Sequence, residues 1–424
     1  MERVTGPDLR MVRAGMLSLN NRSASLLATL LLRCAAAFAG PPGSPVPVQL
    51  STPQDLFKVY AWIESGFTAN VDSPKDRQNF GRLFDDRSNE PLFNQAAITL
   101  ERTLSTTPAD FSWGFKLQSI AGSDARFIHS LGLFDRITDN LVQPDISEAY
   151  LNLHFPVLTV GGLDLKLGKF VTLEGAETVD PRTNVLYSHS YIFNFGIPFN
   201  HTGALATLHA SRAVDLYAGI TRGVNTSVED NNDSVAFHGG IGLNLFDGRL
   251  TVLGTTHVGP EIPDNNHDYR YLNDITIVAK PTERLTLITD LNFIYDEAVA
   301  ATAYGIAQYL TYAFNDFISI AVRGEIWRDA NNFYVAQFAE NDDLADSLRG
   351  GNVMLDPRTV TGGETTYGAI TLGLTIKPPV PKPLTGCLIR PEVRYDCSLN
   401  GTRPFNDSAE RDQFTAGVDV IFTF

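Results

Sequence analysis

The chain has few cysteines, no long apolar run and little basic charge, and each shortage narrows the class of protein. Three cysteines are too few to form a disulfide framework for 424 residues. No stretch of 18 apolar residues occurs, which argues against a membrane-spanning helix. Lys and Arg number 33 against 48 Asp and Glu, so the formal charge is −15 and we expect no nucleic-acid partner.

The N-terminal residues have the pattern of a secretory signal peptide. Four arginines precede the apolar run at 24–32, and Ala-Phe-Ala at 37–39 is a small-x-small cleavage pattern. We therefore expect residues 1–39 to be a signal peptide and the Pro-rich residues 40–56 to be a periplasmic lead-in. An amphipathic soluble helix is the alternative reading of residues 1–39. Their removal would leave a formal charge of −18.

The last eleven residues, 414–424, alternate between apolar and polar with a single exception at Ile421. A period of two puts the apolar residues on one face of a β-strand. The length suits one pass of a tilted strand across a bilayer, which takes about 9–11 residues. The segment and its terminal Phe424 are similar to the closing strand of Gram-negative outer-membrane barrels.

Similar segments recur along the chain and predict an all-β fold, a transmembrane antiparallel β-barrel over residues 57–424. Bacterial single-chain barrels have an even number of strands. We count sixteen, at 57–70, 93–104, 110–121, 146–155, 161–170, 201–211, 213–222, 234–245, 249–258, 269–279, 284–295, 303–314, 317–328, 364–377, 387–398 and 413–424.

The connections between these strands alternate between long and short. Short ones include Phe246-Asp247-Gly248 and Asn315-Asp316, which have the composition of hairpin turns. Short turns at one end and long loops at the other are typical of outer-membrane barrels, with the short turns in the periplasm and the long loops outside the cell.

Charges keep to one face of the strands. On segment 57–70, Phe57, Val59 and Ile63 alternate with Lys58 and Glu64. A charge in the middle of the lipid-facing surface would cost roughly 2–4 kcal/mol. We therefore expect the charged face to line the lumen and to be wet.

One stretch carries a family resemblance. Its motifs are Leu165-Lys-Leu-Gly-Lys-Phe170, Gly175-Ala-Glu177, Asn184, Tyr187-Ser-His-Ser-Tyr191 and Phe195-Gly-Ile-Pro-Phe-Asn-His-Thr-Gly203. This stretch resembles the OmpL-like putative β-barrel porin-2 family. The resemblance implies an outer-membrane channel, and it supplies no catalytic residue.

The connection 171–200 is the first candidate for a functional site. It holds the charged residues Glu174, Glu177, Asp180 and Arg182, followed by an aromatic run from 187 to 199. Such apolar side chains need a surface to pack against. We expect the loop to fold inward and constrict the barrel. The alternative is a hydrophobic extracellular cap or a short extra hairpin.

Charged residues on three of the strands are further candidates for the lumen or the constriction. They alternate with apolar neighbours and are Lys166, Arg323, Glu325, Arg390, Glu392, Arg394 and Asp396. Opposite charges facing each other would create a transverse field in the pore. The alternative is that these pairs brace the wall.

Two cysteines remain after removal of the signal peptide. If Cys387 and Cys397 lie on one strand, about 33 Å separates them. A disulfide requires Cα atoms within about 7 Å. We therefore predict that these two cysteines do not form a disulfide.

These observations predict an outer-membrane porin, a water-filled channel for passive diffusion of small hydrophilic solutes or ions. The alternatives are a structural or adhesive barrel plugged by its loops, or an outer-membrane hydrolase with its site at the rim. We expect no enzymatic activity, catalytic residue, cofactor or metal. The predicted partners are outer-membrane lipid, lipopolysaccharide, small hydrophilic solutes and, by analogy with sixteen-stranded porins, two further copies in a homotrimer.

Overall fold

The computed structural model describes residues 56–105, 107–137, 140–335 and 363–424. The predicted signal peptide, residues 1–39, and all but the last residue of the predicted lead-in, residues 40–56, lie outside the described residues and stay predictions. Among the described residues, no helix is long and apolar enough to cross a membrane.

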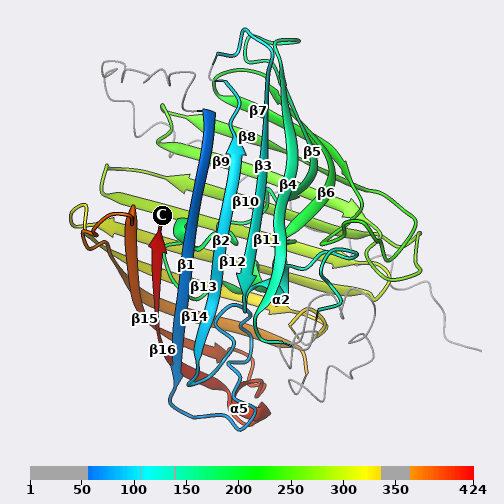
Figure 1. The fold of residues 1–424 in the computed structure, drawn as a ribbon. Helices are drawn as coiled ribbons and strands as arrows, with labels where there is room; N and C mark the ends of the chain where they lie inside the picture. Colours follow the sequence, from blue (N-terminus) through cyan, green and yellow to red (C-terminus); the bar gives the residue numbers. More distant parts are fainter. Residues whose placement is uncertain (1–55, 106, 138–139, 336–362) are drawn as a thin grey trace, which may run out of the picture. The chain divides into compact units, whose positions relative to one another are not determined.

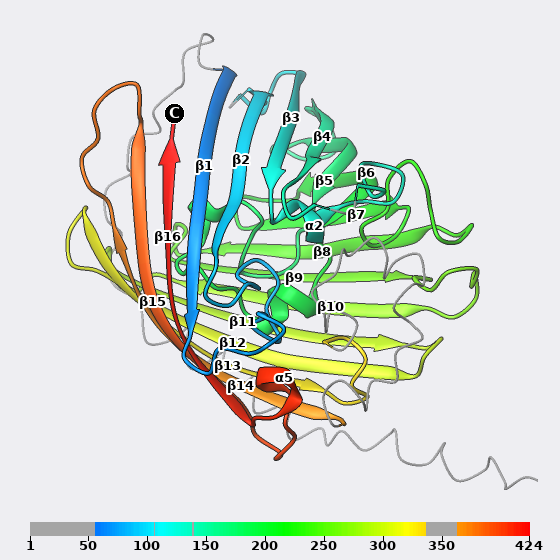
Figure 2. The ribbon, with the colours of Figure 1, turned by 60° about the horizontal axis from the view of Figure 1, so that its bottom comes forward.

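The described residues form sixteen antiparallel strands in one closed barrel (Figures 1 and 2). The first eight are β1 (Phe57–Asn70), β2 (Pro91–Arg102), β3 (Ser112–Gly122), β4 (Gln143–Phe155), β5 (Leu163–Val171), β6 (Asn200–His209), β7 (Val214–Thr221) and β8 (Ala236–Leu245). The others are β9 (Leu250–Gly259), β10 (Arg270–Ala279), β11 (Leu285–Asp296), β12 (Ala301–Ala313), β13 (Ile318–Asp329), β14 (Thr365–Ile376), β15 (Gly386–Ser398) and β16 (Asp412–Thr423). The predicted fold is confirmed, and each predicted strand end is within three residues of the observed one.

The first and last strands close the barrel. β1 pairs antiparallel with β16, from Trp62 opposite Thr423 to Asn70 opposite Thr415. A closed barrel leaves no unpaired strand edge, so every strand has a hydrogen-bonded neighbour on both sides. The C-terminal segment that the alternating pattern singled out is this closing strand.

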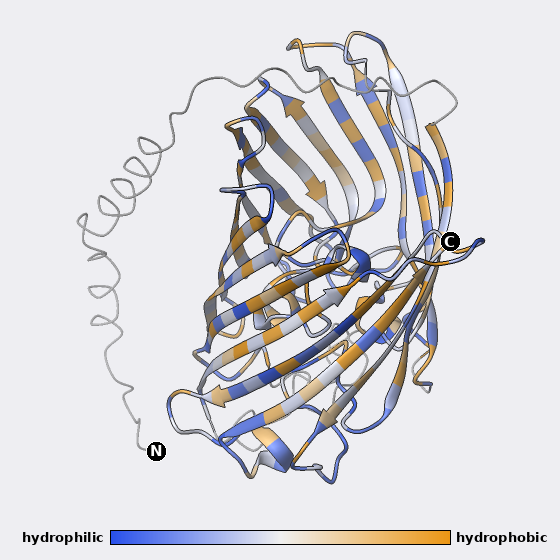
Figure 3. Ribbon diagram, turned by 90° about the vertical axis from the view of Figure 1, so that its left-hand side faces the viewer, coloured by the Kyte–Doolittle hydropathy of each residue, from blue (hydrophilic) through white to orange (hydrophobic). Residues whose placement is uncertain are grey.

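The two faces of the sheet differ in polarity, and Figure 3 shows the resulting bands of hydrophobic and hydrophilic residues along the strands. On β1, Phe57, Val59 and Ile63 are exposed on the outer face, whereas Trp62 and Glu64 are buried on the inner face. Large apolar residues are exposed in this way on most strands. An apolar outer face is compatible with lipid, and the charged side chains lie on the inner face. The alternation therefore determines which face of the wall is turned toward the membrane.

The long connections lie at one end of the barrel and most of the short ones at the other. Among the long ones are 71–90, 123–142 and 172–199, whereas 297–300 at the same end is as short as a turn. The predicted turn at the opposite end has φ angles of 54° at Phe246, 55° at Asp247 and 84° at Gly248. Asp and Gly tolerate this left-handed backbone, which explains their place in the turn.

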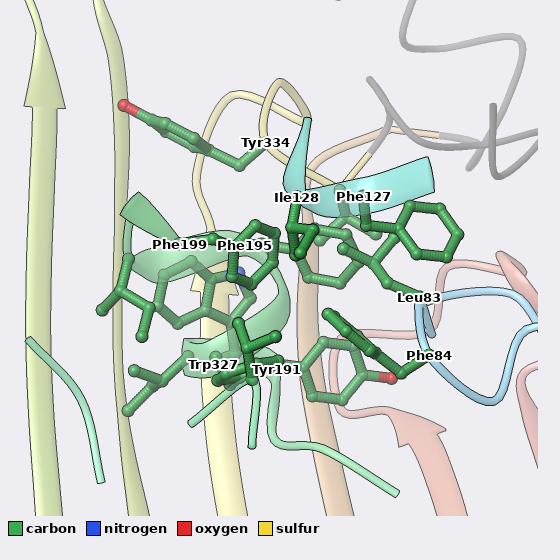
Figure 4. Close-up of a cluster of buried hydrophobic side chains, with 14 of the residues drawn as sticks. Leu83, Phe84, Phe127, Ile128, Tyr191, Phe195, Phe199, Trp327 and Tyr334 are labelled. Carbon is green, nitrogen blue, oxygen red and sulfur yellow. The ribbon is translucent and has the colours of Figure 1, made fainter. Parts of the chain in front are cut away.

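The hydrophobic core lies inside the barrel and combines side chains of the long loops with inner-facing strand residues such as Trp62 and Trp327. Figure 4 shows Leu83 and Phe84 of loop 71–90 near Phe127 of the short helix α2 (Ala125–Ile128) and Phe199 of loop 172–199. The Phe84 ring centroid lies 5.8 Å from that of Phe127 and 5.6 Å from that of Phe199. Three loops therefore pack against one another within the barrel.

Candidate functional site

Loop 172–199 is folded into the barrel, where it contacts inner-facing side chains of several strands. It contains a short 3-10 helix, η2 (Pro181–Thr183), and a π-helical turn, η3 (Ile192–Gly196). Every residue of η3 is buried. The aromatic run of this loop thus packs against the interior of the barrel, as its composition required.

The two ends of the loop are fixed to β10 and β11. The Gly175 N–H donates to Asp274 Oδ1 at 3.0 Å, and the Ala176 N–H donates to Asp290 Oδ2 at 3.0 Å. At the other end, Asn292 Nδ2 donates to the Gly196 carbonyl at 3.0 Å. The two acidic residues and the asparagine therefore bind the backbone where the loop enters and leaves the interior.

Arg323 on β13 fastens the middle of the loop. Its Nη1 lies 2.8 Å from Glu177 Oε1 and donates to the Ser188 carbonyl at 2.6 Å. Its Nη2 donates to the His189 carbonyl at 3.2 Å, and its Nε donates to Glu325 Oε1 at 3.1 Å. One guanidinium thus joins two acidic residues and two loop carbonyls through the fixed fork of N–H donors that arginine provides.

Arg390 and Glu392 on β15 hold other parts of the loop backbone. Arg390 Nη1 donates to the carbonyls of Pro181 and Asn184, both at 2.8 Å. Glu392 accepts hydrogen bonds from the Tyr187 N–H at 2.8 Å and the Ser188 N–H at 3.1 Å. Two neighbouring inner-facing residues of β15 therefore bind different backbone groups: Arg390 binds carbonyls and Glu392 binds N–H groups.

Arg394 and Asp396 continue the row on β15. Arg394 Nη1 donates to the His189 carbonyl at 2.5 Å, and its Nε donates to Asp396 Oδ1 at 2.8 Å. Asp396 also accepts a hydrogen bond from Arg82 Nη2 of loop 71–90 at 2.7 Å. These residues join two loops to the same strand.

The expectation that this charged row is wet is wrong. The relative exposures of Arg323, Glu325, Arg390, Glu392, Arg394 and Asp396 lie between 0% and 6%. Loop 172–199 covers them and supplies backbone groups in place of water. Buried charges remain charged only when paired and hydrogen-bonded, and here both conditions are met.

The acidic residues at the start of the loop differ in their surroundings. Burial alone would raise the pKa of Glu177, but Arg323, His189 and the Ser190 N–H outweigh it and lower that pKa to about 2. Burial, followed by the charges of Asp274 and Glu261, raises the pKa of Glu174 well above its ordinary value. Neither carboxyl oxygen of Glu174 has a hydrogen-bond partner in the described part of the chain.

Asp180 and Arg182 lie at the partly exposed edge of the loop. Their side chains form an ion pair at 2.6 Å and are 22% and 24% exposed. The guanidinium carbon of Arg182 also lies 3.9 Å from the Trp62 ring centroid and 4.9 Å from that of Tyr60. Arg182 thus attaches the loop to β1 through a cation–π contact.

Lys166 lies on the inner face of β5, outside this network. Its Nζ is 4.8 Å from the ring centroid of Tyr150 and 5.5 Å from that of Phe170. Of the eleven candidate residues named from the sequence, the structure brings ten into or against loop 172–199 and leaves this lysine on the neighbouring wall.

Sequence reasoning missed several residues that hold the loop. They are Gln95, Asp274, Asp290 and Asn292. All three on β10 and β11 stand at alternating inner positions, as Arg390 and Glu392 do. The same signal, polar residues two apart on a strand, could have identified them.

Within the described residues, no group of three or more His, Cys, Asp or Glu side chains is arranged to hold a metal ion. Cys387 and Cys397 are free and lie near opposite ends of β15. The predicted absence of a disulfide between them agrees with this arrangement.

The family model described as "Putative beta-barrel porin-2, OmpL-like" matches residues 56–424, so the chain belongs to that family. No curated protein matches the chain. The outer membrane channel DcaP of Acinetobacter baumannii has a similar fold, with a TM-score of 0.53 and 10% identity over 87% of this chain and 97% of that one. The anion-selective porin from Comamonas acidovorans gives a TM-score of 0.52 and 7% identity over 87% and 99% of the two chains.

Family and fold together make this protein an outer-membrane porin, a channel for small solutes located in the outer membrane. The function and location predicted from the sequence are thereby confirmed.

Proposed function

We propose that this porin lets small hydrophilic solutes and ions diffuse passively past loop 172–199, which acts as its constriction. The observation that carries the proposal is the fastening of the loop to inner-facing residues of β10, β11, β13 and β15. A loop held at so many points keeps its shape, so the space beside it has a constant width. Size exclusion by a fixed aperture needs this rigidity.

We propose that solutes pass the loop on the side of β5–β8. Five inner positions of these strands are glycines that remain partly exposed, so no side chain narrows the lumen there: Gly168, Gly203, Gly219, Gly240 and Gly242. The polar contacts that fasten the loop go mainly to other strands. Both features favour free space next to β5–β8.

Unpartnered polar atoms near the extracellular ends of β8 and the adjacent β9 support this route. Neither ring nitrogen of His238 has a hydrogen-bond partner in the described part of the chain, and His257 Nδ1 lies 3.6 Å from Glu261 Oε1, beyond hydrogen-bond distance. Buried polar groups without a protein partner are normally satisfied by water. A hydrated region on this side of the loop is what a passage for hydrophilic solutes requires.

The proposal includes no catalytic activity. A hydrolase would need an acid–histidine or serine–histidine pair at the extracellular rim. On the long-loop side, the pairs of His189 with Glu177 at 3.3 Å and of His257 with Glu261 at 3.6 Å are buried, with side chains at most 8% exposed. The pair that Asp164 forms with His154 at 2.6 Å is near the turn joining β4 to β5, at the opposite end of the barrel. It is better explained as a polar contact within the wall.

We further propose that the protein works as a homotrimer in a membrane that contains lipopolysaccharide. The support is the analogy with other sixteen-stranded porins and the apolar outer face described above. Cross-linking of the protein in native outer membranes would test the trimer.

Single-channel recording of the refolded mature chain in a planar bilayer with asymmetric KCl tests the main proposal. Discrete conductance steps with a defined reversal potential are expected. Silence from barrels whose folding is verified by heat-modifiable mobility would overturn it and favour a barrel plugged by its loops. Loss of an activity on deletion of a single acid–histidine pair would favour the hydrolase.

A further inference from the structure

Lys166 differs from the other cationic side chains of the inner wall because it has no anionic partner. Lys58 lies 3.7 Å from Glu101, Lys116 forms an ion pair with Glu148, and Arg182 is paired as described above. Lys166 forms no hydrogen bond or ion pair with any described residue; its neighbours are two aromatic rings.

The aromatic neighbours position the ammonium but do not satisfy it. The rings of Tyr150 and Phe170 lie 4.8 and 5.5 Å from Lys166 Nζ, within the range of cation–π attraction. A ring face accepts no conventional hydrogen bond, whereas an ammonium has three N–H donors. The residue opposite Lys166 on β4 is Asn152, whose Oδ1 is also unpartnered among the described residues. Lys166 is therefore held in place with its donors free.

The acidic residues nearest to Lys166 are engaged elsewhere. Glu148 is paired with Lys116, and Asp164 contacts His154 at 2.6 Å and His209 at 3.4 Å. The charges of Glu148 and Asp164 act on Lys166 from a distance, but neither carboxylate occupies its N–H donors.

The inner positions of β9, β10 and β11 at a comparable distance from the turns carry no charge. Thr251, Val278 and Ile288 form one inner-facing row across β9, β10 and β11. An anion at this level is thus attracted to the β5 side rather than to β9–β11. Fields of this kind concentrate ions of opposite sign near the wall.

We propose that Lys166, positioned by Tyr150, is a binding site for the carboxylate group of small anionic solutes on their way through the pore. The inference rests on the proposed function, because a solute must reach the lumen to meet this residue. One ammonium whose donors are free among the described residues matches one carboxylate, and charge-assisted hydrogen bonds to it would replace those of water.

The experiment measures reversal potentials of single channels under a potassium acetate gradient. Lys166→Gln should lower the permeability of acetate relative to potassium by about two- to five-fold, the range expected for a partly exposed charge pair. Lys166→Arg keeps the charge and should stay within about two-fold of the wild type by the same estimate. Lys58→Gln is the matched control, since it removes one equal charge from the same wall at a residue that already has a partner.

The outcomes separate this inference from the proposed function. If the wild type conducts and selectivity changes equally in Lys166→Gln and Lys58→Gln, the binding site is overturned. The proposal of passive diffusion then still stands. A wild-type barrel that conducts no ion would overturn passive diffusion itself. A loss confined to Lys166→Gln, with normal heat-modifiable mobility of every variant, supports the site.

Discussion

Replacing Arg323 with methionine should release loop 172–199 from the wall of the barrel. The substitution keeps an unbranched side chain of similar length but removes the donors that reach Glu177, Ser188 and His189. Glu325 keeps a second cation, since Arg394 Nη2 lies 3.3 Å from its Oε1. The main loss is therefore the guanidinium partner of Glu177 and of two loop carbonyls.

The expected size of the effect follows from burial. Arg323 has no exposed surface, and the side chain of Glu177 is 5% exposed. Breaking a buried ion pair from one side costs about 3–5 kcal/mol because the remaining charge is left without a partner. This corresponds to an increase of about 10²- to 5 × 10³-fold in the fraction of molecules with the loop undocked. The strands should stay paired, because their ladders do not depend on this residue.

Trypsin provides the assay, since Arg182 lies within the loop and its side chain is only 24% exposed. Cleavage after Arg182 in folded barrels, followed by mass spectrometry, should accelerate with the undocked fraction when docking is fast relative to cleavage. Arg328→Met is the matched control on the same strand. Arg328 is paired with Glu364, which is 60% exposed, so its loss should cost no more than about 1 kcal/mol.

Equal cleavage rates in Arg323→Met, Arg328→Met and the wild type would refute the assignment of Arg323 as a fastening residue. The double variant Glu177→Gln with Arg323→Met gives a second check. Because a neutral amide replaces the stranded carboxylate, the double variant should cleave more slowly than Arg323→Met alone.

Three further predictions follow from the same geometry. The pKa of Glu177 is lowered only while the loop is docked, so ionised Glu177 stabilises the docked loop. This stabilisation is complete above pH 4.5 and is lost as pH falls toward 2, by about 3 kcal/mol in total. Single-channel current noise should rise as pH falls through this window, and constant noise would contradict the prediction. Gly66→Ala would place a Cβ 2.1 Å from the Tyr187 hydroxyl oxygen, so this variant should also expose the loop to trypsin. Cys387 and Cys397 should both react with a maleimide in denatured protein without reductant; failure to react would indicate a disulfide.

The strands could be predicted because their signal is local. On β1 and β16 the alternation of apolar and polar residues reports which face each side chain occupies, whatever the partner strand is. The same alternation marked Arg390, Glu392 and Arg394 as inner-facing residues. The inward fold of loop 172–199 was predictable for a different reason, since its aromatic run needed a surface to pack against.

The roles of the charged residues could not be predicted because they depend on distant backbone groups. Arg323 binds carbonyls of residues 188 and 189, more than a hundred positions earlier in the chain. A carbonyl is present in every residue, so no sequence pattern identifies the one that a guanidinium will bind. For the same reason the row on β15 was expected to face water, whereas it faces the loop.

The sequence by itself determined the class of fold, the number of strands and the faces of several strands, because side-chain alternation and turn composition act over a few residues. Tertiary structure alone decided which inner charges are covered and which stay accessible. Arg390 and Lys166 look alike in sequence, each standing between apolar neighbours on a strand. One is buried against loop carbonyls and the other lies unpaired beside Tyr150, because the loop crosses one part of the wall and leaves the other free.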